Sequence, residues 1–184
     1  MSSHAFCSHC GARTVVRIPP GDHLPRVICD ACGIVHYENP RVVVGCVPEH
    51  DGRLLICKRA IEPRLGYWTI PAGFLENGES LEEGAAREAH EEAMATVRIG
   101  SLLAVISIPE ARQVHVFFRA TLLGGQHGAG PESLDTALVD PLDIPWADIA
   151  FPSTRFALER FLQDRAAGLD TPHVTTMARR LTTD

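Results

Sequence analysis

The chain has 184 residues, of which 45% are hydrophobic, and its 23 acidic and 17 basic residues give a net charge of −6. This composition fits one ordinary globular domain with a small appendage, and it lacks the basic runs that bind nucleic acid or anionic membranes. No apolar stretch is long enough to span a membrane, and the first ten residues lack the basic and apolar regions of a secretory signal, so we expect a cytoplasmic protein with no membrane partner.

Four of the six cysteines occur in two Cys-x-x-Cys-Gly sequences near the N-terminus. They are Cys7, Cys10, Cys29 and Cys32. This spacing predicts one tetrahedral Zn²⁺ site, and a glycine after each second cysteine permits the tight turn that such a site needs. Four thiolates leave no coordination position for water, so the zinc would be structural; a rubredoxin-type iron site is the alternative. His9 and His36 lie near the cysteines and are expected to be surface histidines.

The sequence Tyr37-Glu-Asn-Pro40 marks a boundary, because the residue before a proline is disfavoured in a helix. We therefore expect a zinc ribbon over residues 1–37, a second domain over residues 38–168, and a C-terminal tail over residues 169–184 without a clear period. The second domain begins with two β-branched runs, residues 42–47 and 54–57, separated by the hairpin signal Asp51-Gly52. Arg59 follows the second run, where it is either solvated or placed to reach a phosphate.

The most acidic stretch, residues 73–95, holds seven glutamates against a single basic residue, Arg87. Ser80 and Glu83 form a capping box, which predicts that a helix begins near Leu81. The glutamates are Glu76, Glu79, Glu82, Glu83, Glu88, Glu91 and Glu92. A generic acidic run of this kind is usually a solvated helix face, but its internal order here favours another interpretation.

On the predicted helix, Glu88, Glu91 and Glu92 stand at positions i, i+3 and i+4, and therefore share one face. Arg87 precedes Glu91 by one helical turn and can orient its carboxylate. Three hard oxygen ligands gathered in this way predict a divalent-cation site for Mg²⁺ or Mn²⁺.

The remainder of the chain contains further predicted elements. Residues 97–108 and 114–123 read as strands, and a glycine-rich loop over residues 124–130 leads to Pro131-Glu132. Residues 140–146 read as a strand or turn, and residues 152–167 as a helix with Ser153 as its cap and Gly168 as its terminator. His115 either lines a pocket or is an internally satisfied histidine.

The acidic stretch resembles the Nudix box, G-x5-E-x7-R-E-U-x-E-E-x-G-U. Gly73, Glu79 and the run Arg87-Glu-Ala-His-Glu-Glu92 match this pattern, whereas Met94 stands where the family has a glycine that ends the helix. The resemblance covers roughly residues 38–166 and implies an α+β fold, the α/β/α Nudix sandwich with a mixed β-sheet. A methionine in a left-handed helix exit would cost about 1 kcal/mol.

The resemblance implies a pyrophosphohydrolase that cleaves a nucleoside diphosphate linked to another moiety. By position, Glu88, Glu91 and Glu92 would bind the divalent ions, with Glu79 nearby and the Ala72 carbonyl as a further ligand. Arg87 would orient Glu91. Many family members add a glutamate from a distal loop as ligand or base; Glu132 best matches that role, followed by Glu110.

An N-terminal four-cysteine ribbon before the box is similar to NADH pyrophosphatases and to related enzymes that act on ADP-ribose or FAD. The S-Q-P-W-P-F-P-x-S element of the NADH group is absent, since the corresponding region reads SLLAVISIPEARQVHVFF. The resemblance thus favours ADP-ribose or FAD as the substrate, with release of AMP. Tyr37 matches a substrate-contacting tyrosine of the NADH group, and the wider group implies a homodimer.

Three alternatives remain. The first is an NADH pyrophosphatase. The second is a Nudix enzyme that acts on nucleoside triphosphates or capped RNA. The third is a module that binds nucleotide or RNA without catalysis, which the retention of every box glutamate disfavours.

Overall fold

A computed structural model describes residues 5–178 and divides between Asn39 and Pro40 into two compact units. The first unit is a three-stranded antiparallel sheet in the order β1-β2-β3. Its strands are β1 (Thr14–Arg17), β2 (Arg26–Cys29) and β3 (Val35–His36). Few side chains are buried in this unit, so hydrophobic packing alone gives it little stability.

The second unit is built on a mixed sheet of eight strands, six of which follow the order β10-β5-β4-β9-β8-β11. The strands are β4 (Arg41–His50), β5 (Arg53–Arg59), β6 (Trp68–Thr69), β7 (Ala72–Phe74), β8 (Val97–Ile108), β9 (Gln113–Leu122), β10 (Ser133–Val139) and β11 (His173–Thr176). The pairs β4–β9 and β8–β11 are parallel and the other pairs are antiparallel. Strands β6 and β7 pair with β5 and β4, respectively, beside the main path.

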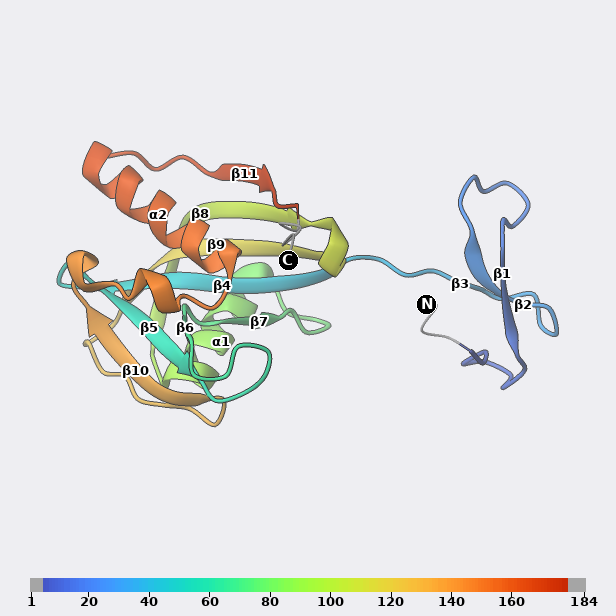
Figure 1. The fold of residues 1–184 in the computed structure, drawn as a ribbon, viewed down its shortest axis with the longest axis horizontal. Coiled ribbons are helices and arrows are strands. Elements are labelled where there is room, and N and C mark those ends of the chain that lie inside the picture. The colour runs from blue at the N-terminus through green and yellow to red at the C-terminus, as the bar shows by residue number, and fades with distance from the viewer. Residues whose placement is uncertain (1–4, 179–184) are drawn as a thin grey trace. The chain divides into compact units, whose positions relative to one another are not determined.

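Two helices, α1 (Leu81–Ala93) and α2 (Pro152–Ala167), cover opposite faces of this sheet (Figure 1). Small residues of α1, Ala85 and Ala89, pack on Val44 and Cys46 of β4. On the other face, Leu158 and Phe161 of α2 belong to a larger cluster. The predicted α/β/α sandwich with a mixed sheet is confirmed.

The first hairpin of this unit forms where the sequence predicts it. Asp51 and Gly52 both adopt positive φ angles, 49° and 78°, as a two-residue type I′ turn requires. Strands β4 and β5 leave this turn antiparallel, and the thiols of Cys46 and Cys57 are buried within them.

Helix α1 begins with the predicted capping box: the Ser80 hydroxyl accepts the Glu83 N–H, and the Glu83 carboxylate accepts the Ser80 N–H. Helix α2 has the predicted bounds and ends at Gly168, but the prediction of Ser153 as its cap is wrong. Phe151 is the N-cap residue and makes no side-chain cap, and Pro152 occupies the first turn. Ser153 points inward and is only 2% exposed, because it lies one position inside the helix start.

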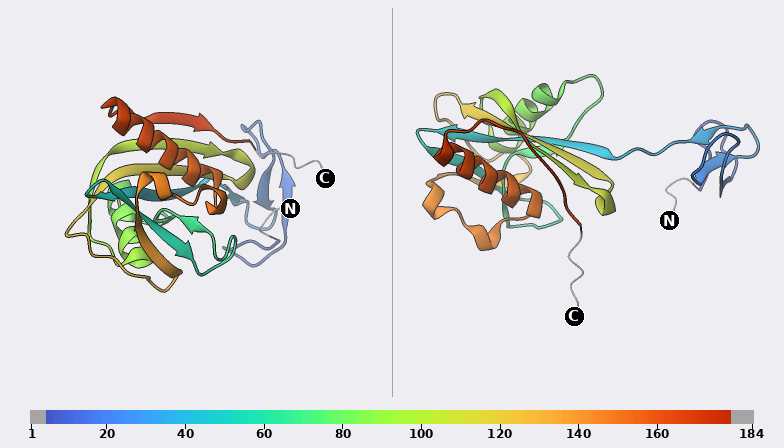
Figure 2. Two further views of the ribbon diagram at one scale, coloured as in Figure 1. Left: turned by 60° about the vertical axis from the view of Figure 1, so that its left-hand side comes forward. Right: turned by 90° about the horizontal axis from the view of Figure 1, so that it is seen from above.

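Two strands were not expected from the sequence. Residues 133–139 form the strand β10. Residues 140–148, expected as a strand or turn, contain two short 3₁₀ turns, Pro141–Asp143 and Trp146–Asp148. Within the expected tail, His173–Thr176 form β11, which pairs with β8 at the edge of the sheet after the chain turns back from α2 (Figure 2). Both unpredicted strands lie at the edges of the sheet and pair with strands that are distant in the sequence, so local periodicity does not reveal them.

Candidate functional site

The four predicted zinc ligands come together in the first unit, where their sulfur atoms all lie within 4.8 Å of one another. The Sγ atoms of Cys7 and Cys32 are 3.7 Å apart, and those of Cys10 and Cys29 are 3.4 Å apart. A tetrahedral site with 2.3 Å Zn–S bonds has ligand separations of about 3.8 Å. The cluster therefore has nearly the size of a four-thiolate zinc site.

Local backbone geometry shapes the two cysteine turns and lowers the pKa of one of the thiols. Gly11 and Gly33 follow the two Cys-x-x-Cys turns with φ near 75°, which is a left-handed conformation that favours glycine. The backbone N–H of Cys32 lowers the pKa of the Cys29 thiol to about 7. The expectation that His36 is a surface histidine is wrong, because it is half-buried with its Nε2 3.3 Å from the Cys7 sulfur. His9 is exposed.

In the second unit, Arg87 organises the carboxylates of the acidic helix. Its Nη1 donates to Glu88 at 2.7 Å and to Glu91 at 2.9 Å, and its Nε and Nη2 donate to the two oxygens of Glu79. The arginine thus orients Glu91, as the sequence predicts, and also Glu88 and Glu79. This pairing holds the pKa of Glu79 down at about 2.

Glu88 and Glu92 are the buried members of the acidic face, and Glu92 is only 6% exposed. Burial, together with the charges of Glu88 and Glu132, raises the pKa of Glu92 to about 8, although the Ala72 N–H donates to its Oε2 at 3.0 Å. Burial also raises the pKa of Glu88. The negative charges of these buried carboxylates are poorly compensated by their surroundings, and a bound cation would stabilise the ionised forms.

Glycine at the start of the acidic stretch permits the sheet to approach these carboxylates. A Cβ atom on Gly73 would lie 2.4 Å from both carboxylate oxygens of Glu88. Gly84 likewise permits α1 to approach the sheet closely, since a Cβ there would lie 2.8 Å from the Val44 side chain. Both contacts are closer than a real Cβ tolerates, so a larger residue at position 73 would displace the Glu88 carboxylate, and one at position 84 would push α1 away from Val44.

The loop over residues 124–132 closes the C-terminal end of α1. The Gly128 N–H donates to the Ala93 carbonyl, and the Gly130 N–H donates to the Glu92 carbonyl, so the loop satisfies helix-end acceptors. The Ala60 N–H then donates to the Glu132 carbonyl, which ties the end of the loop to the segment after β5. This path brings the Glu132 side chain to the buried carboxylates.

Glu88, Glu91, Glu92 and Glu132 line one large cleft of about 2120 Å³. Arg59 lines the same cleft, where its Nε donates to the Pro63 carbonyl and its guanidinium lies 5.0 Å from the centre of the Phe151 ring. Its positive charge lowers the pKa of Glu92 against the larger effect of burial. The cleft therefore presents carboxylates together with an arginine and an aromatic ring.

Other predicted residues have different surroundings. Glu110 lines the cleft but is exposed, and Glu132, not Glu110, is among the main causes of the raised pKa values of Glu88 and Glu92. His115 lines the cleft with its Nε2 2.9 Å from the Gln113 Oε1, and burial lowers its pKa to about 4. Its Nδ1 is buried and has no hydrogen-bond partner among residues 5–178.

Tyr37 belongs to the first unit, is 64% exposed, and lies beneath the Arg26 guanidinium.

The donor chemistry of the acidic face fits a hard divalent cation such as Mg²⁺ or Mn²⁺. Arg87 supplies positive charge between Glu88 and Glu91, and a metal ion binding there would replace part of that pairing. In the described part of the chain, only the cysteine cluster gathers three or more ligand atoms within 4.8 Å of one another. The carboxylates would therefore need side-chain rotations to share an ion.

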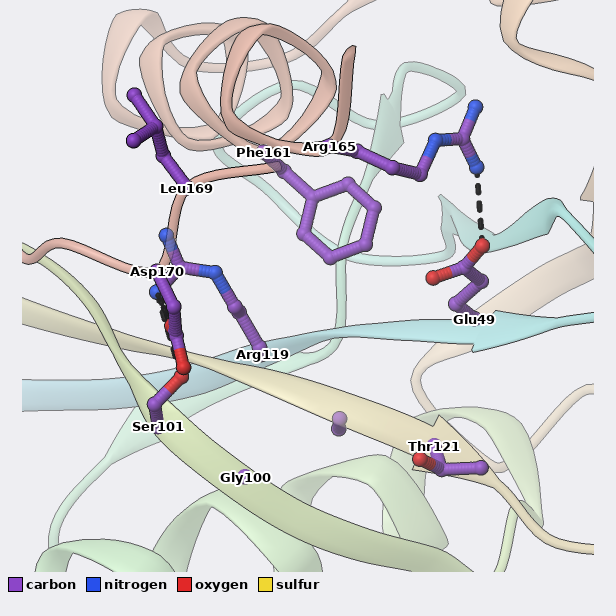
Figure 3. Close-up of a pocket in the computed structure, with 10 residues that line it drawn as sticks. Glu49, Gly100, Ser101, Arg119, Thr121, Phe161, Arg165, Leu169 and Asp170 are labelled. Atoms are coloured by element: carbon purple, nitrogen blue, oxygen red, sulfur yellow. Dashed lines mark hydrogen bonds and ion pairs between the residues drawn. The ribbon is translucent and has the colours of Figure 1, made fainter. Parts of the chain in front are cut away.

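A second, smaller cavity of about 400 Å³ lies between α2 and the sheet (Figure 3). Its two arginines are already paired, Arg119 with Asp170 at 2.9 Å and Arg165 with Glu49 at 3.0 Å. It contains none of the predicted site residues. Its ionic groups therefore have a structural explanation and do not indicate a reaction.

Several residues of the site are not apparent from the sequence pattern. The sequence places Gly130 in a glycine-rich loop, and the repeated glycines are the only local signal of its role. Phe151 and Met177 line the cleft from segments that carry no motif. These two residues reach the cleft only through the topology of the fold.

Comparison with known proteins identifies both units. The family model described as "Nudix N-terminal", a zinc ribbon, matches residues 5–38, and the family model described as "NUDIX domain" matches residues 39–160. A crystal structure of a NUDIX hydrolase from Nitrosomonas europaea is 48% identical, with a TM-score of 0.92, over 95% of this chain and 99% of that chain.

Two curated relatives carry functional names. An ADP-ribose pyrophosphatase of Methanocaldococcus jannaschii is 32% identical over 113 residues, which are 59% of this chain and 67% of the relative. An NAD-capped RNA hydrolase, NudC, of Stutzerimonas stutzeri is 29% identical over 168 residues, which are 90% of this chain but only 58% of the relative.

Proposed function

Because the chain belongs to the Nudix family, we propose that it is a pyrophosphohydrolase that cleaves a nucleoside diphosphate linked to another moiety, with Mg²⁺ or Mn²⁺ as the catalytic cation. We propose ADP-ribose or FAD as the substrate type and AMP as a product.

The observation that carries this proposal is the charge arrangement in the large cleft. Glu88 and Glu92 are buried there with raised pKa values, and Arg59 lines the same cleft. Uncompensated carboxylates would repel a diphosphate, whereas carboxylates loaded with divalent cations would attract it. Arg59, whose Nε donates to the Pro63 carbonyl, would bind a phosphate oxygen through its other guanidinium nitrogens.

The side chains then take distinct roles in the proposed reaction. Glu88, Glu91 and Glu92, with the Ala72 carbonyl, would hold the cations, which when bound lower the pKa of water and neutralise the diphosphate. Arg87 and Glu79 would keep the ligand carboxylates oriented. Glu132, brought in by the glycine-rich loop, would accept a proton from the attacking water.

Two findings favour the ADP-ribose or FAD type. The relative from Methanocaldococcus jannaschii is named an ADP-ribose pyrophosphatase, and the sequence element typical of NADH pyrophosphatases is absent here. Tyr37, exposed in the ribbon, is proposed as a further substrate contact.

A second candidate is hydrolysis of NADH or of NAD-capped RNA. It is favoured by the relative from Stutzerimonas stutzeri, whose match extends over 90% of this chain and therefore includes ribbon residues. The short ribbon has no basic run, so we rank this activity second.

A substrate panel tests the proposal. The purified protein is incubated with Mg²⁺ or Mn²⁺ and ADP-ribose, FAD, NADH, NAD-capped RNA or nucleoside triphosphates, and released AMP or other nucleotide is measured. We expect AMP from ADP-ribose or FAD. Preferred cleavage of triphosphates would contradict the substrate class, and an absence of any cleavage would favour a binding module.

We further propose that the protein is a cytoplasmic homodimer. The six cysteines form no disulfide in the structure, which fits a reducing compartment. Between residues 5 and 178, neither helix has the length and hydrophobicity that crossing a bilayer requires. Light scattering of the purified protein would measure the mass and test the dimer.

A further inference from the structure

The C-terminal strand β11 places a side chain in the substrate cleft. The Met177 N–H directly after β11 donates to the Ser107 carbonyl of β8 at 2.9 Å, which continues the parallel pairing by one residue. Side chains alternate along this strand, so His173, Thr175 and Met177 are half-buried, whereas Val174 is 80% exposed. Met177 packs against the core cluster beneath α2 and also lines the cleft.

A polar cluster centred on the buried Asp164 fixes β11 in this position. The Asp164 carboxylate of α2, whose residue is 4% exposed, accepts from His173 Nε2 at 2.9 Å and from Arg119 Nη2. Arg119 also pairs with Asp170, which accepts from Ser101 (Figure 3). These contacts join β8, β9, α2 and the segment leading to β11, so Met177 is held by a defined framework.

The strand order places Met177 far from the carboxylates, at the other end of the sheet surface that lines the cleft, which we call the floor. From β7, where Ala72 contacts Glu92, the sheet continues through β4, β9 and β8 to β11. The intervening strands line the cleft between these ends with Val43 of β4, Gln113, His115 and Phe117 of β9, and Ile108 of β8. Four strand spacings correspond to about 19 Å, so the floor extends well beyond the diphosphate site.

The chemistry of this floor differs from that of the carboxylate end. Val43, Ile108 and Met177 offer apolar surface, and the His115 imidazole is neutral at pH 7 because burial lowers its pKa to about 4. A flat, uncharged ring gains from such a surface, and a methionine sulfur packs favourably on aromatic rings. A second phosphate would gain nothing from it.

We propose that the floor ending at Met177 is the subsite for the ring-bearing end of the nucleotide substrate, and that β11 makes Met177 a specificity-determining residue. This inference rests on the proposed function. Residues 161–178 lie beyond the matched Nudix domain model, so the chain supplies this contact from its own C-terminal segment.

Kinetic variants test the subsite. Met177→Glu should raise the KM for ADP-ribose about tenfold while kcat stays within about twofold, because a carboxylate replaces an apolar contact that binds without reacting. Val174→Glu, on the exposed side of the same strand, should leave both constants unchanged. A KM for Met177→Glu within twofold of wild type would overturn the proposal.

A labelling experiment separates this inference from the proposed reaction and needs no charged substitution in the fold. In Met177→Cys, excess ADP-ribose with Mg²⁺ should slow maleimide labelling of the new thiol at least about fivefold relative to labelling without nucleotide; Val174→Cys should show no protection, and wild-type protein gives the background from the native cysteines. Protection without hydrolysis would support the subsite and refute the proposed function. Hydrolysis without protection would refute the subsite and leave the function intact.

Discussion

Gly130 approaches the backbone of Glu91 so closely that a Cβ on this glycine would lie 1.7 Å from the Glu91 carbonyl oxygen. Its φ angle is not in the left-handed region, so the glycine is required here for space and not for backbone conformation. The approach allows the Gly130 N–H to bond the Glu92 carbonyl, and two residues later the chain presents Glu132. The glycine-rich loop is thus part of the site architecture.

Gly130→Ala should therefore move the loop away from α1. We expect a loss of about 1–3 kcal/mol in the free energy of unfolding and a lower kcat on any substrate that the wild type cleaves. Gly128→Ala is a matched control, because its Cβ would have only Met94 Sδ, at 3.7 Å, within reach. Equal stability and kcat for both variants, measured by urea unfolding and steady-state kinetics, would show that the close approach is unimportant.

Met94 adopts a left-handed conformation, with φ 49° and ψ 26°, at the end of α1, where glycine is the residue that this conformation favours. Since an exposed methionine gains little by burial there, Met94→Gly should raise the free energy of unfolding by about 1 kcal/mol. His90→Gly, at an exposed position inside the same helix, should lower it by a similar amount. A Met94→Gly variant less stable than wild type in urea would contradict this account.

The raised pKa of Glu92 predicts how pH and magnesium act on stability. Between the unfolded pKa near 4.3 and the folded value of about 8, the folded state binds a proton that the unfolded state lacks, so stability falls as pH rises. Magnesium prefers the ionised carboxylate, so its stabilising effect should be larger at pH 8 than at pH 6.

Thermal unfolding in magnesium-free buffer and in excess Mg²⁺ measures both trends. Chelators are omitted because they would also remove metal from the cysteine cluster. Glu92→Gln should flatten the pH dependence between pH 5 and pH 8. A magnesium-induced rise in Tm that is no larger at pH 8 than at pH 6 would contradict the role of Glu92.

The cysteine cluster gives a separate prediction. Cys29→Ser should abolish retention of one equivalent of zinc and unfold the ribbon, because metal binding contributes on the order of 10 kcal/mol to such small units. The second unit has its own core and should keep its helical circular dichroism. Cys57→Ser, in that second core, is the control that should retain zinc. Full zinc content in Cys29→Ser would refute the four-thiolate site.

Local chemistry made a large part of the structure predictable from the sequence. The capping box at Ser80, the turn at Asp51-Gly52 and each of the two Cys-x-x-Cys-Gly turns depend on a few neighbouring residues, and each forms as expected. The helical register likewise placed Glu88, Glu91 and Glu92 on the side of α1 that lines the cleft.

The remaining features depend on contacts between residues distant in the chain. The burial that raises the pKa of Glu92 comes from packing α1 against the sheet, and the helix register alone does not show it. The strand β11 depends on Asp164 and Arg119, which its own four residues cannot reveal. The sequence also predicts the wrong cap at Ser153, because local composition does not distinguish the N-cap position from the first turn.

The most direct test of the central claim is AMP release from ADP-ribose and FAD by wild type, Glu91→Gln and Glu92→Gln at saturating Mg²⁺. Glu82→Gln, an exposed residue in the first turn of α1, serves as the matched control. We predict that each of the two ligand variants loses at least about a hundredfold in kcat while Glu82→Gln retains wild-type turnover. Unchanged turnover in both Glu91→Gln and Glu92→Gln would contradict cation-dependent hydrolysis by this helix face.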